Sequence, residues 1–310
     1  MEIATRDAYG KALADLGLTN PNIVVLDADL SKSTKTVEFC KAFPDRFFNM
    51  GVAEANMIGT AAGLATCGKI AFASTFAVFA TGRVYDQIRM CLCYPKTNVK
   101  ICATHAGISV GEDGASHQSN EDIALMRVLP NMTVIVPADG VETEKAVAVI
   151  AEYAGPVYLR LGRLKLPVIF SQDYKFEIGR GVQLKGGADV SIIACGLMVH
   201  EALKASEELL KEGIRAGVVN MSSVKPLDEA LVARCAKETG ALVTAEEHMV
   251  TGGLGDAVSE VACRTHPVPV IRVGVTKFGE SGSPKELLEK YGLTAGAVAG
   301  ACREAIRMKK

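Results

Sequence analysis

One stretch of the sequence gathers glycines, histidines and carboxylates into a short segment: Thr104-His105-Ala106-Gly107-Ile108-Ser109-Val110-Gly111-Glu112-Asp113-Gly114-Ala115-Ser116-His117-Gln118. The apolar run 99–103 before it predicts a buried strand, and the polar residues 119–122 after it predict the start of a helix. The stretch is therefore expected to be a loop at the carboxyl end of a strand, which is the edge where parallel α/β sheets bind their ligands.

The chemistry of this loop favours a sugar or cofactor site. Its glycines allow sharp turns and a close approach of the backbone to a ligand. Its histidines, carboxylates, serines and glutamine can donate hydrogen bonds, accept them and carry charge. A surface loop without a function stays an alternative. A metal site is disfavoured, because His105 and His117 are far apart in sequence and no further histidine or cysteine lies nearby at ligand spacing.

The composition is that of a globular protein and excludes several classes of function. The chain has 310 residues, of which 49% are hydrophobic and 22% charged, and this length suggests two domains. A net charge of −1 gives no general attraction to nucleic acid or to an anionic membrane. No run is long and apolar enough to span a bilayer, and the first residues do not resemble a signal peptide. The nine scattered cysteines are typical of reduced thiols in a cytoplasmic protein.

Short apolar runs alternate with helical patterns along the chain. Strands are expected at 23–26, 47–50, 69–74, 99–103, 133–136, 157–161, 190–195, 216–220, 242–245 and 268–273. Helices are expected at 5–16, 51–65, 76–90, 120–127, 141–153, 199–211, 227–237, 255–263 and 295–308. Because strands and helices alternate, we predict an α/β fold with two doubly wound domains, residues 1–165 and 188–310, joined by a linker at 166–187.

A helix of small residues is expected to begin near Glu54. A glutamate in the first turn often only complements the helix dipole. If apolar neighbours keep water away, however, the pKa of its carboxyl is raised, and the group can share a proton with a ligand nitrogen near neutral pH. Phe76 and Phe79 follow a strand end at a spacing of three residues. That spacing is typical of core residues, and it also suits the wall of a pocket for a flat heterocycle.

Together these residues resemble the C-terminal half of transketolase, which consists of the pyrimidine-binding domain and the C-terminal domain of a thiamine diphosphate enzyme. The resemblance covers essentially the whole chain. The motifs that carry it are Gly51-Val52-Ala53-Glu54, Phe76-x-x-Phe79, Thr104-His105, Gly111-Glu112-Asp113-Gly114, His117-Gln118, and Glu246-Glu247-His248 followed by Thr251-Gly252-Gly253-Leu254-Gly255.

The resemblance implies roles for individual residues. Glu54 is expected to bond N1′ of the aminopyrimidine of thiamine diphosphate, with Phe79 stacked on that ring and Phe76 lining the same pocket. His105, Asp113 and His117 are expected to hold the sugar near the reacting carbon, so that Glu54, His105 and His117 are the expected catalytic residues. Substrate phosphate is expected to be bound by Arg6, Ser33 and Arg163, of which the arginines can form charge-assisted bonds to phosphate.

The resemblance also implies that another chain supplies half of the site. The diphosphate-binding module, with its Gly-Asp-Gly motif and the Asn that holds Mg²⁺, is not found in this sequence, and no metal ligand is assigned here. We therefore expect the second subunit of a split transketolase, active only with an N-terminal subunit in a two-plus-two heterotetramer. Such a complex transfers a two-carbon ketol unit from a ketose phosphate to an aldose phosphate, a reaction of the pentose phosphate pathway and of carbohydrate metabolism.

Other functions remain open from the sequence. The β subunit of 2-oxo acid dehydrogenases has the same plan of two domains, but the loop with His105, Asp113 and His117 argues against it. Chemistry like that of 1-deoxyxylulose-5-phosphate synthase is favoured by Tyr85-Asp86-Gln87 and disfavoured by Thr104-His105. A scaffold without activity is the remaining possibility.

Overall fold

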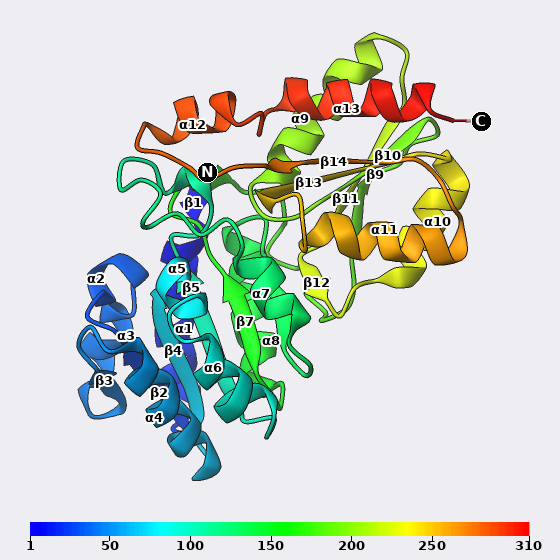
Figure 1. Ribbon diagram of the computed structural model, residues 1–310. Helices are drawn as coiled ribbons and strands as arrows, with labels where there is room; N and C mark the ends of the chain where they lie inside the picture. Colours follow the sequence, from blue (N-terminus) through cyan, green and yellow to red (C-terminus); the bar gives the residue numbers. More distant parts are fainter. Residues whose placement is uncertain (310) are drawn as a thin grey trace.

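Two β-sheets organise the chain, and helices cover both faces of each (Figure 1). The computed structural model describes residues 1–309. The larger sheet has seven strands and the smaller has five, and neighbouring strands run parallel except at one edge of each sheet. The α/β class with two doubly wound halves, expected from the alternation, is confirmed.

The first sheet has the strand order β12-β6-β7-β5-β4-β2-β3. Its strands are β2 (Ile23–Asp27), β3 (Phe47–Asn49), β4 (Ile70–Phe76), β5 (Val99–Thr104), β6 (Thr133–Ile135), β7 (Val157–Arg160) and β12 (Ser223–Lys225). The central strands are buried along their whole length, as expected for strands covered on both faces. The edge strand β12 comes from the second half of the chain and pairs antiparallel with β6, so the two halves share this sheet.

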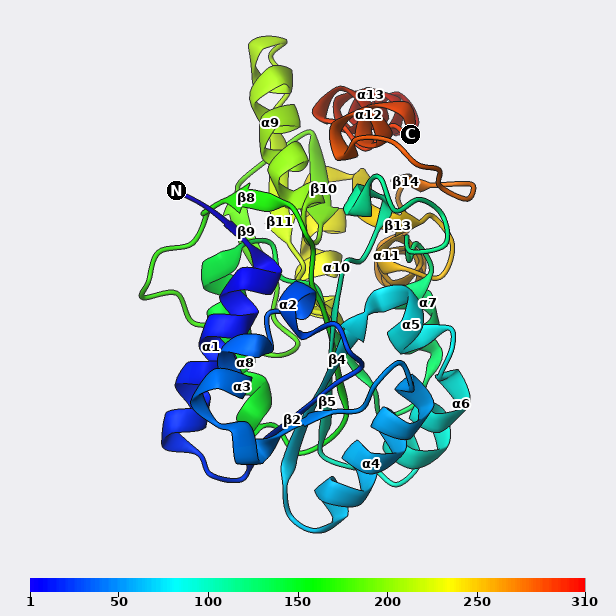
Figure 2. The same ribbon diagram turned by 90° about the vertical axis from the view of Figure 1, so that its left-hand side faces the viewer.

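Helices cover the two faces of the first sheet in separate layers (Figure 2). One layer consists of α1 (Thr5–Thr19), α3 (Val37–Ala42) and α8 (Gly140–Glu152). The other consists of α4 (Glu54–Thr66), α5 (Ala77–Thr81), α6 (Tyr85–Gln87) and α7 (Asp122–Val128). Tyr9 and Leu13 fill the core under the first layer, and Met57 and Ile58 fill the core under the second.

The second sheet has the order β14-β13-β10-β11-β9. Its strands are β9 (Val182–Lys185), β10 (Val190–Ala194), β11 (Ala216–Asn220), β13 (Leu242–Met249) and β14 (Val270–Val275). The helices α9 (Met198–Lys211) and α13 (Ala295–Arg307) lie on one face, and α10 (Glu229–Thr239) and α11 (Leu254–Thr265) lie on the other (Figure 1). The short helix α12 (Pro284–Lys290) precedes α13, and β1 (Glu2–Ala4) pairs with β8 (Lys165–Pro167).

The segment 76–90 differs from the single helix expected there. Phe76 ends β4, where it pairs with Thr104 of β5, and its backbone is extended. Two short helices, α5 and α6, follow on either side of Gly82, and the chain then continues into a π-helical turn at Ile88–Cys93. The expectation failed because the apolar residues of this segment fit a helical spacing, whereas the pairing of β4 with β5 keeps Phe76 in the strand.

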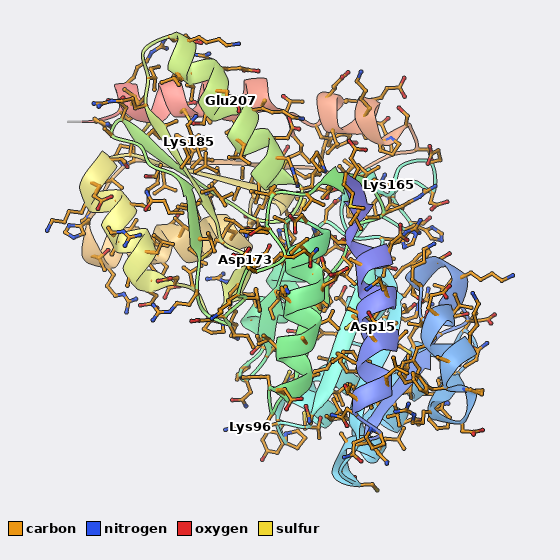
Figure 3. The ribbon with its side chains drawn as sticks, turned by 180° about the vertical axis from the view of Figure 1, so that it is seen from behind. Asp15, Lys96, Lys165, Asp173, Lys185 and Glu207 are labelled. Atoms are coloured by element: carbon orange, nitrogen blue, oxygen red, sulfur yellow. The ribbon has the colours of Figure 1, made fainter. Side chains whose placement is uncertain are left out.

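Charged side chains lie over the outside of both halves. Asp15 on α1 and Glu207 on α9 are exposed examples, seen from behind in Figure 3. Within residues 1–309, none of the helices has the length and apolar character needed to cross a membrane.

The buried side chain of Arg160 joins the two halves. The Arg160 guanidinium donates to both carboxylate oxygens of Asp122, at 2.7 and 3.1 Å, and also to the carbonyl oxygens of Ser119 and Glu247. Burial alone would raise the pKa of Asp122, but Arg160 outweighs burial and brings that pKa below its usual value. Since Glu247 lies on β13, this one side chain ties the first sheet to the second.

Removing the buried guanidinium of Arg160 is expected to lower the stability of the folded chain. Arg160→Met leaves Asp122 buried without a partner, so the free energy of unfolding should fall by about 3–5 kcal/mol. Urea unfolding followed by circular dichroism measures the loss. Arg264→Met is the matched control, because Arg264 pairs with Glu229 on the surface, where both side chains are 59% exposed. Equal losses for the two variants would contradict the assigned role of Arg160.

Candidate functional site

Three strands end at the same edge of the first sheet and bring their loops together. The register pairs Phe76 of β4 with Thr104 of β5, and Asp27 of β2 with Ser74 of β4. The loops that follow Asp27, Phe76 and Thr104 therefore leave the sheet side by side. Because parallel strands present all their carboxyl ends at one edge, residues far apart in sequence meet there.

His105 lies at the centre of this edge. Its side chain is buried and stacks on the Phe76 ring, with the centroids 3.8 Å apart. Arg6 Nη1 lies 3.0 Å from His105 Nε2, and because a guanidinium only donates, Nε2 accepts. The proton of the neutral ring is then on Nδ1, which donates to the Thr104 hydroxyl at 2.8 Å. Burial, together with the positive charge of Arg6, lowers the pKa of His105 to about 3.

Aromatic side chains form a wall beside this histidine. The Phe76 and Phe79 rings lie nearly parallel, with centroids 6.0 Å apart and 13° between their planes. His117, from the far end of the loop, meets the edges of both rings at centroid distances of 6.3 and 5.4 Å. The structure thus brings together the two phenylalanines and the two histidines singled out from the sequence.

Glu54 is buried in the first turn of α4, with 3% of its surface exposed. The purely apolar surroundings expected for it are not found, because Arg83 Nη1 donates to Glu54 Oε1 at 2.7 Å. The same guanidinium lies over the Phe79 ring, 4.2 Å from the centroid. Arg83 therefore connects Glu54 to the aromatic wall. Arg83 was not predicted from the sequence, because its contact with Glu54 joins residues 29 positions apart.

The two arginines expected to bind phosphate both contact the loop. Arg6 donates to the Ser33 carbonyl at 3.2 Å as well as to His105. Arg163 donates to the Val110 carbonyl at 2.8 Å, and its Nη1 lies 3.8 Å from Asp113 Oδ2. Both guanidinium groups are partly exposed and hold the same loop, so each can reach a ligand above it.

The loop that contains Ser33 is held by one buried carboxylate. Asp27 accepts hydrogen bonds from the Leu30 amide at 2.6 Å and from the hydroxyls of Thr34 and Thr36 at 2.7 and 2.9 Å. Burial raises the pKa of Asp27 although these donors oppose the shift. No role was predicted for Asp27, which orders the backbone on both sides of Ser33.

The arrangement fits a flat heterocycle next to an anionic, hydroxylated ligand. The rings of Phe76, Phe79 and His117 offer stacking surfaces, and Glu54 offers a buried proton acceptor beside them. Imidazoles and guanidinium groups on the other side match hydroxyl and phosphate oxygens. In the part of the chain that the structure describes, no group of three or more His, Cys, Asp or Glu side chains is arranged to hold a metal ion.

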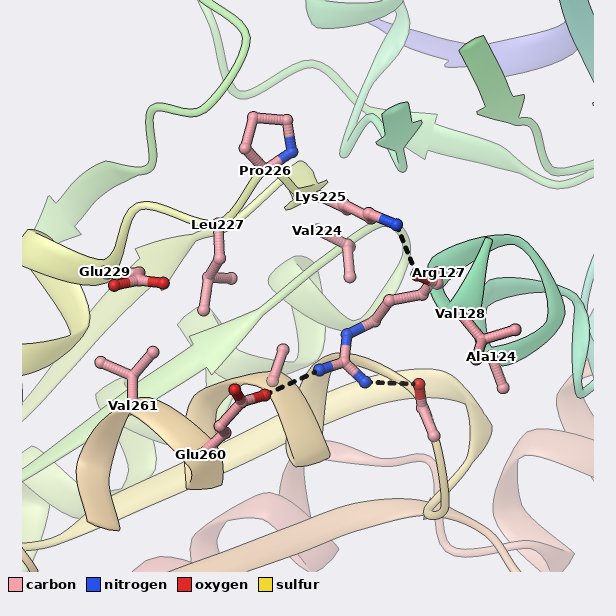
Figure 4. A pocket seen from close by; sticks show the side chains of 12 residues that line it. Ala124, Arg127, Val128, Val224, Lys225, Pro226, Leu227, Glu229, Glu260 and Val261 are labelled. Atoms are coloured by element: carbon pink, nitrogen blue, oxygen red, sulfur yellow. Dashed lines mark hydrogen bonds and ion pairs between the residues drawn. The ribbon is translucent and has the colours of Figure 1, made fainter. Parts of the chain in front are cut away.

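A separate cavity of about 560 Å³ lies between α7, the segment around Pro226 and α11 (Figure 4). Its cationic groups already have partners, since Arg127 bonds the Gly252 carbonyl and pairs with Glu260, while Lys225 donates to the carbonyls of Arg127 and Leu129. None of the residues at the carboxyl ends of β2, β4 and β5 lines this cavity. The cavity is therefore separate from the candidate functional site.

The neutral state of His105 can be tested directly. Because its pKa is about 3 in the folded protein and 6.5 in the unfolded chain, the unfolded state binds more protons between these values. The free energy of unfolding should therefore rise with pH between about 3 and 6.5, and this contribution of His105 should be lost as the pH falls through that range.

In ¹H–¹³C NMR spectra assigned with a His105→Gln variant, the His105 ring should not titrate between about pH 5 and 8. A midpoint near that of a free histidine peptide in this range would contradict the structure.

Comparison with known proteins places both halves in one family. Residues 1–168 match the family model described as "Transketolase, pyrimidine binding domain", and residues 179–298 match "Transketolase, C-terminal domain". The chain is similar to a putative transketolase C-terminal section from Methanocaldococcus jannaschii, with 52% identity over 98% of this chain and 96% of that protein. It also matches human transketolase, with 41% identity over 97% of this chain but only 49% of the human protein.

Solved structures agree with this assignment. A structure titled "Split gene transketolase, inactive beta4 tetramer" superposes with a TM-score of 0.94 at 59% identity, covering 99% of this chain and 100% of that one. Transketolase from Campylobacter jejuni superposes with a TM-score of 0.83 at 26% identity, covering 98% of this chain and 47% of that one. The chain therefore belongs to the transketolase family and comprises its pyrimidine-binding and C-terminal domains.

Proposed function

We propose that this chain is the subunit of a two-chain transketolase that supplies the pyrimidine half of a thiamine diphosphate site. The complex transfers a two-carbon ketol unit from a ketose phosphate to an aldose phosphate. The observation that carries the proposal is the buried carboxylate of Glu54 next to the stacked rings of Phe76 and Phe79, at the strand ends that also present His105 and His117. The family of the first domain implies thiamine diphosphate as the cofactor.

When bound, thiamine diphosphate supplies a carbanion that can attack a carbonyl and store the two-carbon unit. The role of Glu54 is to share a proton with N1′ of the aminopyrimidine, which requires a carboxyl out of water. Phe79 would stack on the pyrimidine, and Phe76 would line the pocket behind it. Arg83 pairs with Glu54 and covers one face of the Phe79 ring, so cofactor binding at these two residues would displace this guanidinium.

The remaining residues would bind the sugar phosphate. Arg6 and Arg163 offer guanidinium groups to the phosphate, helped by Ser33. The neutral His105, together with His117 and Asp113, would hold the hydroxyl and carbonyl oxygens of the sugar. A neutral imidazole suits this task, because Nε2, which accepts from Arg6 in the chain alone, can accept from a sugar hydroxyl instead.

A partner chain would complete the cofactor site. It would carry the diphosphate-binding domain and its Mg²⁺, in a two-plus-two assembly with sites between subunits. Support comes from two relatives, the "C-terminal section" of Methanocaldococcus jannaschii and the split-gene protein whose β4 tetramer is titled inactive. A cytoplasmic location agrees with nine cysteines that are all unpaired.

Reconstitution tests the proposal. The chain is mixed with the product of a candidate gene for the diphosphate-binding half, thiamine diphosphate and Mg²⁺, and ketol transfer from xylulose 5-phosphate to ribose 5-phosphate is measured. Activity is expected from the mixture and not from either chain alone. Robust transfer by this chain alone would refute the need for a partner, and pyruvate decarboxylation by the mixture would favour a 2-oxo acid dehydrogenase.

The donor sugar is tested in the same assay. A 6-deoxy-6-sulfo-D-fructose transketolase subunit from Clostridium sp. is 44% identical to this chain over 98% of its length. A sulfonate and a phosphate both present tetrahedral anionic oxygens to the arginines. Sulfofructose is therefore included as an alternative donor, and a preference for it would replace the sugar phosphate in the proposal.

The proton-sharing role of Glu54 predicts a large loss in the Glu54→Gln variant. The amide keeps the shape but cannot accept the proton, so kcat of the reconstituted complex should fall by about 10²–10⁴-fold. Glu208→Gln, on the exposed face of α9, is the control and should leave kcat unchanged. Thermal unfolding of each variant checks that the chain stays folded. Near-normal activity of the folded Glu54→Gln complex would favour a scaffolding role for this chain, without a part for Glu54 in the reaction.

A further inference from the structure

The loop that contains the sugar-binding residues is fastened to the second half of the chain. Its short 3-10 helix, η3 (Ile108–Val110), buries Ile108 completely. Ile108 belongs to the apolar core of the second half, together with Val275 of β14 and Leu287 of α12. The loop therefore leaves β5 of the first sheet and inserts a side chain into the core of the other half.

A carboxylate from the second sheet holds the same turn. Glu247, on β13, is buried, and its Oε1 accepts a hydrogen bond from the Ser109 amide at 2.7 Å. Gly107 lies directly against this carboxylate, so that a Cβ at position 107 would come within 2.3 Å of Glu247 Oε1. Its φ of +83° adds a second reason for glycine there. The turn between His105 and Ser109 is thus shaped around Glu247.

The other end of the loop is held by the segment between β14 and α12. Gln118 Nε2 donates to the Glu280 carbonyl at 3.0 Å and to the carbonyls of Ile108 and Gly111 at 3.2 and 3.3 Å. Gly279 lies so close that a Cβ there would overlap Gln118 Oε1. One buried amide therefore closes the loop on itself and ties it to the second half.

We infer that the second domain sets the position of the sugar-binding loop. The positioning residues are Glu247 of the second domain and Gln118 of the loop itself. The inference rests on the proposed function, because it concerns the residues assigned there to the sugar. Glu247 fixes the turn that follows His105, and Gln118 is the direct neighbour of His117. Asp113 lies between these two attachments, so the three sugar-binding residues depend on contacts made outside their own domain.

The neighbours of Glu247 on β13 make different contacts, which makes the assignment specific. Glu246 accepts from the amides of Leu254 and Gly255 at 2.8 Å and so holds the start of α11. His248 Nε2 lies 3.2 Å from the Ala124 amide of α7. Of these three buried side chains, Glu247 is the one whose carboxylate meets the loop.

Hydrogen exchange of the purified chain tests the positioning without a partner or activity. In Glu247→Ala the Ser109 amide loses its acceptor, so exchange of loop residues 105–118 should become at least about tenfold faster. Glu247→Gln keeps an oxygen acceptor and should restore protection. Asp228→Ala is the matched control, since Asp228 caps α10 through the Leu231 amide, away from the loop. Unchanged loop exchange in folded Glu247→Ala would overturn the inference.

Kinetics of the reconstituted complex test the consequence for the sugar. Glu247→Ala should lower kcat/KM for the donor by about 10–100-fold, mainly through KM, with the affinity for thiamine diphosphate unchanged. Glu247→Gln should recover most of the loss, and Asp228→Ala should not change KM. If Glu247→Ala does not fold, Gln118→Met removes the bond to the Glu280 carbonyl at similar length, and a higher KM is again expected. An unchanged donor KM in the folded variants would refute the inference, whereas an inactive wild-type complex would refute the proposed function.

Discussion

The buried guanidinium of Arg160 is the interaction on which the arrangement of the site depends. It binds Asp122 at the start of α7, the Ser119 carbonyl at the end of the histidine loop, and the Glu247 carbonyl on the second sheet. A buried charge of this kind is stable only when its partners are fixed. The same contacts therefore close the loop, start the helix that follows it and dock the two halves of the chain.

The site itself follows from the parallel sheet. Strands β2, β4 and β5 end at one edge, and each delivers a different kind of group there. The loop after β2 brings Ser33, the end of β4 brings the aromatic wall, and the loop after β5 brings the histidines. Glu54 reaches the same place from the first turn of α4. The stacking surface and the buried carboxylate are the groups proposed for the cofactor, and the cationic rim is the part proposed for the sugar phosphate.

Much of this could be predicted from the sequence, because the signals were local. Apolar runs identified the buried strands, and the motifs around Glu54, Phe79 and His105 identified the family. Long-range contacts gave no local signal. The pairing of β12 with β6 and the insertion of Ile108 into the second core depend on residues far apart in the chain. Arg83 was missed for a similar reason, since its ion pair with Glu54 joins the turn between α5 and α6 to the first turn of α4, 29 residues earlier in the chain.

The most direct test of the central claim is a structure of the assembled complex with thiamine diphosphate bound. We predict that N1′ of the aminopyrimidine lies about 2.6–3.2 Å from a carboxylate oxygen of Glu54. We also predict that the pyrimidine stacks on Phe79 and that Arg83 no longer pairs with Glu54. A cofactor ring bound elsewhere, with Glu54 still paired to Arg83, would contradict the account.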